Sequence, residues 1–287
     1  MQNTIEFKQS ILVTIKQRKS IRTYQPIPIS SDKRKTLQQA IGIPGNNLFR
    51  FAWFEQKSRN GLAERIGTYG VIKGAQTFVV GVLRKDAEGG KDAAIQFGYE
   101  FEQIILKATE LGLGTCWLGG IFNAATFAKG IDLQQNEKIV MLSPVGIPSE
   151  KKHLISKLTS RAANSNTRKP WQKLFYESEI GFPLSKEAAG KFAPALEMVR
   201  LAPSAVNSQP WRVIRSENGF HFYAAATNYF ALGKERFLRY NDMGIAMAHF
   251  ELACKDLGLA GEWIFEKQLD DGDEPNLEYI RSWKTGD

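Results

Sequence analysis

The stretch with the densest polar chemistry is residues 201–215, which read LAPSAVNSQPWRVIR. Pro203 has no amide donor and cannot continue the apolar helix that we expect before it. The alternating residues that begin at Trp211 predict a strand. Between the two elements, Ser204 and Asn207 offer a hydroxyl and an amide beside exposed backbone donors. The stretch is either a bend that holds a ligand or an ordinary loop, because serine, asparagine and proline are common in both.

The bulk composition limits the classes of protein to consider. The chain has 287 residues, of which 43% are apolar and 11% aromatic, enough for one large or two ordinary domains with a sizeable core. No apolar run approaches the ~18–20 residues that cross a bilayer. The charged N-terminus is not typical of a signal peptide, so we expect a cytoplasmic protein. The 2 cysteines and 3 histidines are too few for a disulfide framework or a zinc cluster, and we expect no metal.

The net charge of +8 is compatible with nucleic acid, a membrane surface or an anionic ligand as partner. The basic residues are densest in residues 151–173, a segment poor in apolar residues. No zinc-finger spacing and no aromatic RNA-binding pattern accompany them. A solvated linker is favoured over a nucleic-acid groove, so we expect neither nucleic acid nor a membrane as partner.

The spacing of apolar residues predicts the elements that position the bend. The clearest helix carries one apolar stripe from Phe97 to Leu111, and Gly112 and Gly114 supply a left-handed stop. Ser31 and Asp32 can cap an earlier helix. We expect helices at residues 8–18, 33–41, 61–69, 97–111 and 192–201, and strands at residues 50–56, 76–83, 138–148 and 211–215.

Two parts of the chain resemble each other. Residues 98–117 (GYEFEQIILKATELGLGTCW) align without a gap with residues 244–263 (GIAMAHFELACKDLGLAGEW), and both pass from a helix through a glycine break into an aromatic strand. More loosely, residues 37–54 align with residues 196–214, although the first copy lacks the serine and glutamine of the bend. Chance similarity between two amphipathic helices is the alternative. We interpret the pattern as an internal duplication.

The duplication predicts an α+β fold of two similar halves, residues 1–165 and 166–287, joined through the basic segment. Two such halves would pack about a pseudo-twofold axis as an intramolecular pseudo-dimer, with the central helices at their junction. Because the interface that would join two subunits is then satisfied within one chain, we expect a monomer.

Three motifs together resemble the FMN-dependent nitroreductase family, in the branch that fuses two nitroreductase-like halves. They are RKSIRTY near the N-terminus, LGLGTCWLGG after the central helix, and A-P-S-x-x-N-x-Q-P-W in the bend, and the resemblance spans residues 18–265. It implies bound FMN, NAD(P)H as transient electron donor, and a small acceptor such as a nitroaromatic or a quinone.

In that family a homodimer builds each of two FMN sites from both subunits. In this chain the basic motif and the glycine turn occur only in the first half, and the serine–asparagine bend occurs only in the second. The resemblance therefore implies one FMN per chain at the junction of the halves, and a second pseudo-site that is dead. The residues it assigns to FMN are Arg18, Ser20, Arg22, Leu118, Gly119, Gly120, Arg168, Lys169, Pro203, Ser204 and Asn207.

The resemblance also suggests a role for each group. Arg18 and Ser20 would bind the phosphate and ribityl end, since a guanidinium bonds two phosphate oxygens at once. Arg22 would reach the pyrimidine edge of the ring, where a cation favours the reduced flavin. The glycine turn would let backbone amides approach the ring. Arg168 and Lys169 would close over the phosphate, or they belong to a surface linker.

No nicotinamide-binding domain is expected, because no G-x-G-x-x-G follows a strand and opens a helix. The donor and the acceptor would occupy one cleft in turn, the cofactor would carry the chemistry, and we name no catalytic side chain. Cys116, Cys254 and His249 are expected in the core. Two alternatives to the enzyme remain: a flavin-binding protein without turnover, and a nucleic-acid binder that exploits the positive charge.

Overall fold

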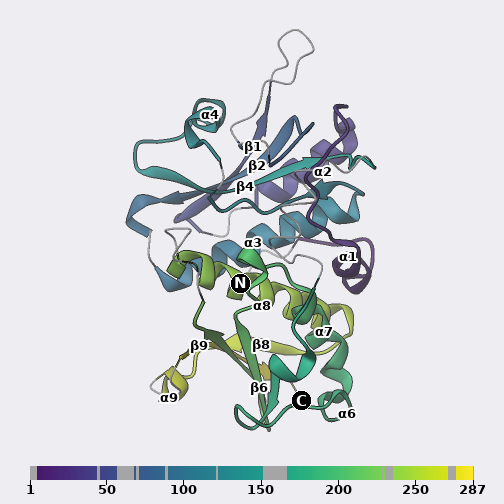
Figure 1. The fold of residues 1–287 in the computed structure, drawn as a ribbon, viewed down its shortest axis with the longest axis vertical. Coiled ribbons are helices and arrows are strands. Elements are labelled where there is room, and N and C mark those ends of the chain that lie inside the picture. The colour runs from purple at the N-terminus through teal and green to yellow at the C-terminus, as the bar shows by residue number, and fades with distance from the viewer. Residues whose placement is uncertain are drawn as a thin grey trace.

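Two long helices, α3 (Lys91–Glu110) and α8 (Glu235–Asp256), lie between two β-sheets in the computed structural model of the chain (Figure 1). The structure describes residues 5–43, 46–56, 68, 71–87, 90–120, 122–150, 167–227, 229, 235–270 and 276–286. Each sheet packs against the central helix pair with apolar side chains that are almost fully buried. No helix in these ranges is both long and apolar enough to cross a membrane.

The first half forms an antiparallel sheet in the order β1-β2-β4-β3. Phe51 on its first strand stacks with Phe101 of α3, which fixes this sheet to the helix pair. Its strands are β1 (Phe49–Glu55), β2 (Thr77–Arg84), β4 (Glu137–Gly146) and β3 (Gly114–Thr115), and its helices besides α3 are α1 (Ile11–Gln17), α2 (Ser31–Ile41) and α4 (Ala124–Ala128).

The second half forms a sheet in the order β5-β6-β7-β9-β8. Its strands are β5 (Phe175–Glu177), β6 (Trp211–Ser216), β7 (Gly219–Ala225), β9 (Leu277–Thr285) and β8 (Gly261–Ile264), and its helices besides α8 are α6 (Lys186–Ala189), α7 (Ala193–Leu201) and α9 (Lys267–Asp270). Apart from β5, which pairs parallel with β6, the strand order repeats that of the first sheet. The repeat includes a β-bulge in the same strand pair, which leaves Val140 in one sheet and Ile280 in the other unpaired.

The crossing of α3 and α8 shows the twofold relation most directly. A Cβ atom added to Gly98 would overlap the carbonyl oxygen of Asn241, and one added to Gly244 would overlap that of Ile95. Ile95 precedes Gly98 by three residues, as Asn241 precedes Gly244. Each glycine therefore contacts the residue three positions before the other glycine, which is the reciprocity of a twofold interface.

The two helices also end alike. Gly112 and Gly258, at aligned positions, have φ angles of 72° and 69°. The next amides donate back into the last turn, Leu113 to the Ala108 oxygen at 2.9 Å and Leu259 to the Cys254 oxygen at 2.8 Å. These are matching glycine C-caps. The predicted fold, with two similar α+β halves and central helices at their junction, is confirmed.

Most predicted elements are present, with ends that differ by a few residues. Two predicted details differ from the structure, and two further predictions cannot be compared with it. Ser31 and Asp32 do not cap α2: the N-cap is Ser30, and its side chain makes no capping hydrogen bond. Gly114 is not a left-handed stop; it begins β3, where a Cβ atom would lie 2.8 Å from Ile21 Cγ1. The helix predicted at residues 61–69 and the boundary at 165/166 fall outside the described residues, so both stay predictions.

The helix crossing generates a test of stability. Gly98→Ala and Gly244→Ala should each lower the free energy of unfolding by about 3 kcal/mol or more, because the added methyl forces the two backbones apart. Gly258→Ala is the matched control: nothing lies within 4 Å of its Cβ position, and the positive φ should cost only about 1 kcal/mol. Urea denaturation measures all three, and equal losses would contradict the close crossing.

Candidate functional site

The N-terminal basic motif is held as an extended segment beside β3. Ser20 forms a parallel bridge with Thr115, and the Ile21 amide donates to the Thr115 oxygen at 2.7 Å. The motif faces the Cys116 thiol, which lies near Arg18 and Arg22 and hydrogen-bonds with Ser20. Burial raises the pKa of this thiol in spite of the two cations. Cys116 is 3% exposed, so the prediction that it lies in the core is confirmed.

Arg18 is the most deeply buried basic residue of the motif. Its side chain is 5% exposed, and its Nε atom donates no hydrogen bond. The carboxylate it faces, Glu102 of α3, lies 3.9 Å from Nε. A buried guanidinium with a donor to spare is a site that an anion can complete.

Glu102 is fully buried and binds partners on both sides of the helix crossing. It accepts a hydrogen bond from Trp117 Nε1 at 2.7 Å and lies 3.0 Å from His249 Nε2 of α8. The other imidazole nitrogen lies 2.9 Å from the Met198 carbonyl oxygen. His249 is thus an interior histidine with both nitrogens satisfied, as predicted.

Arg168 connects the N-terminal motif with the bend. Its Nη1 donates to Asn207 Oδ1 at 3.2 Å and its Nη2 to the Leu201 oxygen at 3.1 Å. Burial lowers the pKa of Arg168 to about 10, and the nearby charges of Arg18 and Arg200 act in the same direction. Two guanidiniums from distant parts of the sequence therefore lie near each other, and Arg168 is half-buried against the bend.

The bend itself is a strained, internally bonded loop. Three of its residues, Val206, Asn207 and Gln209, have φ angles of 45°, 57° and 48°, a left-handed region that costs a β-branched residue such as valine most. Ser204 Oγ accepts from the Gln209 amide at 2.9 Å, which leaves its hydroxyl proton available. The side-chain amide of Asn207 accepts from Arg168 and donates to the Thr167 oxygen, and its contact with the flavin stays a prediction.

A buried acid on α8 anchors the bend. Both oxygens of Asp242 accept from the Ala205 amide, at 3.0 and 3.1 Å, and Tyr229 donates to Asp242 at 2.5 Å while it also bonds Ser208. Burial raises the pKa of Asp242 to about 8, although the Tyr229 and Ala205 hydrogen bonds oppose the shift. Sequence reasoning missed this residue, but an aspartate directly before the apolar stretch 243–248 of α8 is a usable signal, because buried acids need partners.

The glycine turn comes next to α8 as well. Leu118 pairs with Leu142 of β4, and a Cβ atom on Gly119 would lie 3.0 Å from Leu238 Cδ2. Nothing lies within 4 Å of the Cβ position of Gly120. Leu238 and Asp242 are four residues apart on α8 and so share a face. The turn and the bend are therefore attached to neighbouring points of one helix.

These contacts form a closed series of neighbouring residues that passes through both halves, and we call this series the circuit. It runs from Arg18 past Cys116 to Gly119, across to α8, from Asp242 to the bend, and through Arg168 back to Arg18. Pro203 lies half-buried at the start of the bend. Of the predicted residues, Lys169 departs from the circuit: its ammonium donates to the Gln209 oxygen at 3.2 Å.

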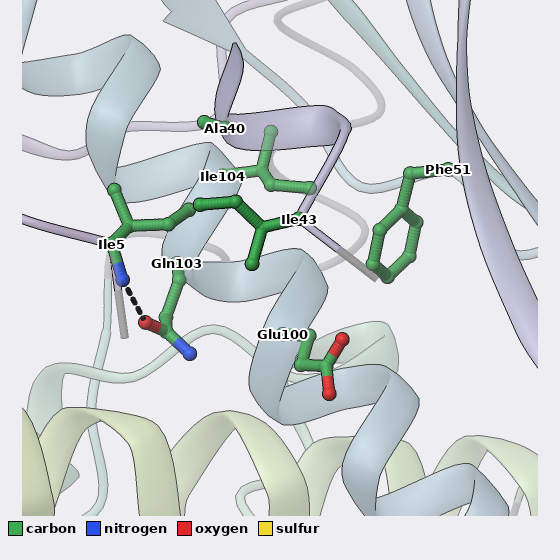
Figure 2. Close-up of a pocket in the computed structure, with 7 residues that line it drawn as sticks. All are labelled: Ile5, Ala40, Ile43, Phe51, Glu100, Gln103 and Ile104. Carbon is green, nitrogen blue, oxygen red and sulfur yellow. Dashed lines mark hydrogen bonds between the residues drawn. The ribbon is translucent and has the colours of Figure 1, made fainter. Parts of the chain in front are cut away.

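A small pocket elsewhere is unrelated to this circuit. Figure 2 shows that it lies among side chains of the first half only, where the Ile5 amide donates to Gln103 Oε1 at 3.1 Å. It is lined by Ile5, Ala40, Ile43, Phe51, Glu100, Gln103 and Ile104, and none of the predicted site residues is among them.

Comparison with known proteins places the chain in a family. Residues 10–254 match the family described as "Putative TM nitroreductase". The chain belongs to this nitroreductase family. A crystal structure of a nitroreductase-family protein from Thermotoga maritima is similar over 99% of this chain and 96% of that one, with a TM-score of 0.57 at 16% identity. An NADPH-flavin oxidoreductase from Vibrio harveyi is 25% identical over 169 residues, 52% of this chain and 68% of that protein.

The Asp242 anchor generates a prediction about pH. Because its pKa in the folded chain lies above the ordinary value of 3.8, the folded state holds an extra proton between about pH 4 and pH 8. Stability from Asp242 is greatest below that window and falls as the pH rises through it, by up to ~1.4 kcal/mol per pH unit. The unfolding free energy of wild type minus that of Asp242→Asn should therefore decrease from pH 4 to pH 8. A difference that stays constant across this range would contradict the assignment.

Proposed function

We propose that this nitroreductase-family chain is an FMN-dependent oxidoreductase that passes two electrons from NAD(P)H to a small acceptor such as a nitroaromatic or a quinone. The observation that carries the proposal is the position of Arg168, which hydrogen-bonds to the bend of the second half and lies near Arg18 of the basic motif, close enough for the two charges to repel. Family membership and the similarity to an NADPH-flavin oxidoreductase support the same chemistry.

The unspent groups of the circuit fit an FMN phosphate. Arg18 and Arg168 lie close enough for their charges to repel, and Arg18 Nε has no acceptor among the described residues. A phosphate carries about two negative charges and several acceptor oxygens, so it would satisfy this donor and relieve the repulsion of the two cations. Ser20, beside Arg18, and the Ser204 hydroxyl add donors of the kind that a phosphate or a polyol accepts.

The rest of the circuit suits the ring. The open space at Gly120 would let the backbone come close to a flat ligand. Arg22 supplies a cation near Cys116. When bound, FMN supplies the hydride chemistry, since it accepts two electrons from a nicotinamide and returns them to an acceptor. The protein would bind, orient and shield it, and no side chain of the circuit is required as acid or base.

We further propose one FMN per chain and a monomer. At the position that corresponds to the glycine turn, the second half has Ile264, Phe265 and Glu266. The bend likewise has no serine–asparagine counterpart in the first half. The second pseudo-site thus lacks the groups that would hold a flavin.

Arg18 gives the sharpest test of the cofactor site. Arg18→Gln should weaken FMN binding about tenfold or more, because it removes a buried charge-assisted donor. Lys19→Gln is the matched control, since it removes the same charge from the next residue, whose side chain is exposed. Flavin absorbance of the purified proteins and fluorescence titration with FMN measure the effect. Wild type should carry about one FMN per chain, and equal losses in the two variants would overturn the assignment.

A second measurement separates the enzyme from a flavin-binding protein without turnover. Anaerobic NADPH or NADH should bleach the flavin absorbance of the wild-type protein within seconds to minutes, and addition of a quinone should restore it. A yellow protein that neither dinucleotide reduces would overturn the oxidoreductase and leave only the binding role.

A further inference from the structure

A second cationic cluster lies on the other side of the segment that carries Arg168. Lys169 Nζ and Arg212 Nη1 both donate to the Gln209 carbonyl oxygen, each at 3.2 Å. Two cations that share one neutral acceptor repel each other, so the arrangement is unfavourable unless an anion joins it. Lys173 is close enough to Lys169 for its charge to lower the pKa of that ammonium further.

The cluster is partly desolvated and uncompensated. Burial lowers the pKa of Lys169 to about 8 and also lowers that of Arg212. Within the described part of the chain, no carboxylate forms an ion pair with Lys169, Lys173 or Arg212. The other hydrogen bond of the Arg212 guanidinium goes to the Trp211 carbonyl oxygen at 2.7 Å. The positive charge is therefore available to a ligand.

The surroundings favour a phosphate over a carboxylate. Tyr176 of β5 pairs with Ile214, two residues beyond Arg212 on β6, so Tyr176 and Arg212 share a face of the sheet. A guanidinium fork, two ammonium groups and a phenol hydroxyl together offer more donors than one carboxylate can accept, and they match a dianionic phosphate.

The cluster is also tied to the proposed flavin site. The backbone amide of Lys169 donates to Gln209 Oε1 at 2.7 Å, and the backbone amide of Gln209 donates to Ser204 Oγ. Arg168 and Lys169 are neighbours in sequence, yet one joins Arg18 and the other joins Arg212. The two neighbours therefore belong to separate cationic clusters, and the proposed FMN phosphate would compensate only the first.

We propose that Lys169, Lys173 and Arg212 bind the 2′-phosphate of NADPH and so select NADPH over NADH as electron donor. The proposal rests on the proposed function, which brings a dinucleotide to the flavin. The 2′-phosphate is the one group that NADPH has and NADH lacks, so a phosphate site beside the flavin site discriminates between the two donors.

The kinetic test compares the two donors in four proteins, the wild type and three variants. In wild type, kcat/KM should be about tenfold or more higher with NADPH than with NADH, and Arg212→Gln should reduce that ratio about tenfold. Lys173→Gln, an exposed position, should reduce it in the same direction. Arg215→Gln is the matched control on the same strand, because Arg215 pairs with Glu177 instead. A ratio near one in wild type, or an Arg212→Gln ratio equal to that of wild type, would overturn the proposal.

A binding test needs no turnover. By calorimetry on the purified protein, adenosine 2′,5′-bisphosphate should bind about tenfold more tightly than adenosine 5′-monophosphate, and Arg212→Gln should abolish the difference. If inorganic phosphate binds as tightly as the bisphosphate, the cluster takes free phosphate and the assignment to the dinucleotide is overturned. If neither dinucleotide is oxidised, the proposed function fails, whereas this measurement still decides the phosphate site.

Discussion

The close crossing of α3 and α8 is the constraint on which the rest of the structure depends. The glycines at the crossing, Gly98 and Gly244, let the backbone of each helix touch the backbone of the other. A larger residue at either place would move the helices apart, and the two halves would no longer meet in this geometry. Everything that the site draws from both halves is placed by this contact.

The crossing also brings two acidic residues buried at the centre of the molecule close to their partners. Glu102 on α3 reaches His249 on α8, and Asp242 on α8 reaches the bend through the Ala205 amide. Buried charges contribute little net stability, but they are costly when their partners move away. Each acid therefore fixes a geometry: Glu102 restrains Arg18, and Asp242 restrains the bend that carries Ser204.

Strain in the bend is maintained by the same anchors. Val206 has a positive φ, which is strained for a β-branched residue, and it is 57% exposed, so it buries little apolar surface in return. The hydrogen bonds of Asp242, Ser204 and Gln209 hold this conformation from both sides. A backbone conformation that is strained and yet held by its surroundings is consistent with a bend shaped for a ligand.

Much of the fold could be predicted from the sequence because its signals are local. Gly112 and Gly258 mark helix ends by backbone conformation alone, and the aligned glycines Gly98 and Gly244 disclose the duplication. The motif residues could be named by type and spacing. The partners of Lys169 could not, because Gln209 and Arg212 are about forty residues away in sequence and only the fold brings them together. Asp242 was missed for the same reason, since its partners lie on a loop and not on its own helix.

The hydrogen bonds that hold the fold together are more alike in the two halves than the groups that could bind a ligand. Trp117 donates its indole proton to Glu102, and its aligned counterpart Trp263 donates to Glu251 at 2.8 Å. The carboxylates stand one helical turn apart in the alignment, so the shared requirement is the buried indole N–H and not one particular position. The second carboxylate oxygen of each glutamate has different partners. That of Glu102 faces Arg18 and His249, whereas that of Glu251 pairs with Lys255 on its own helix. A framework that must satisfy buried donors is needed in both halves, but the second oxygen of each carboxylate meets different partners in the two halves. This asymmetry supports the proposal that the duplicated chain has a single flavin site.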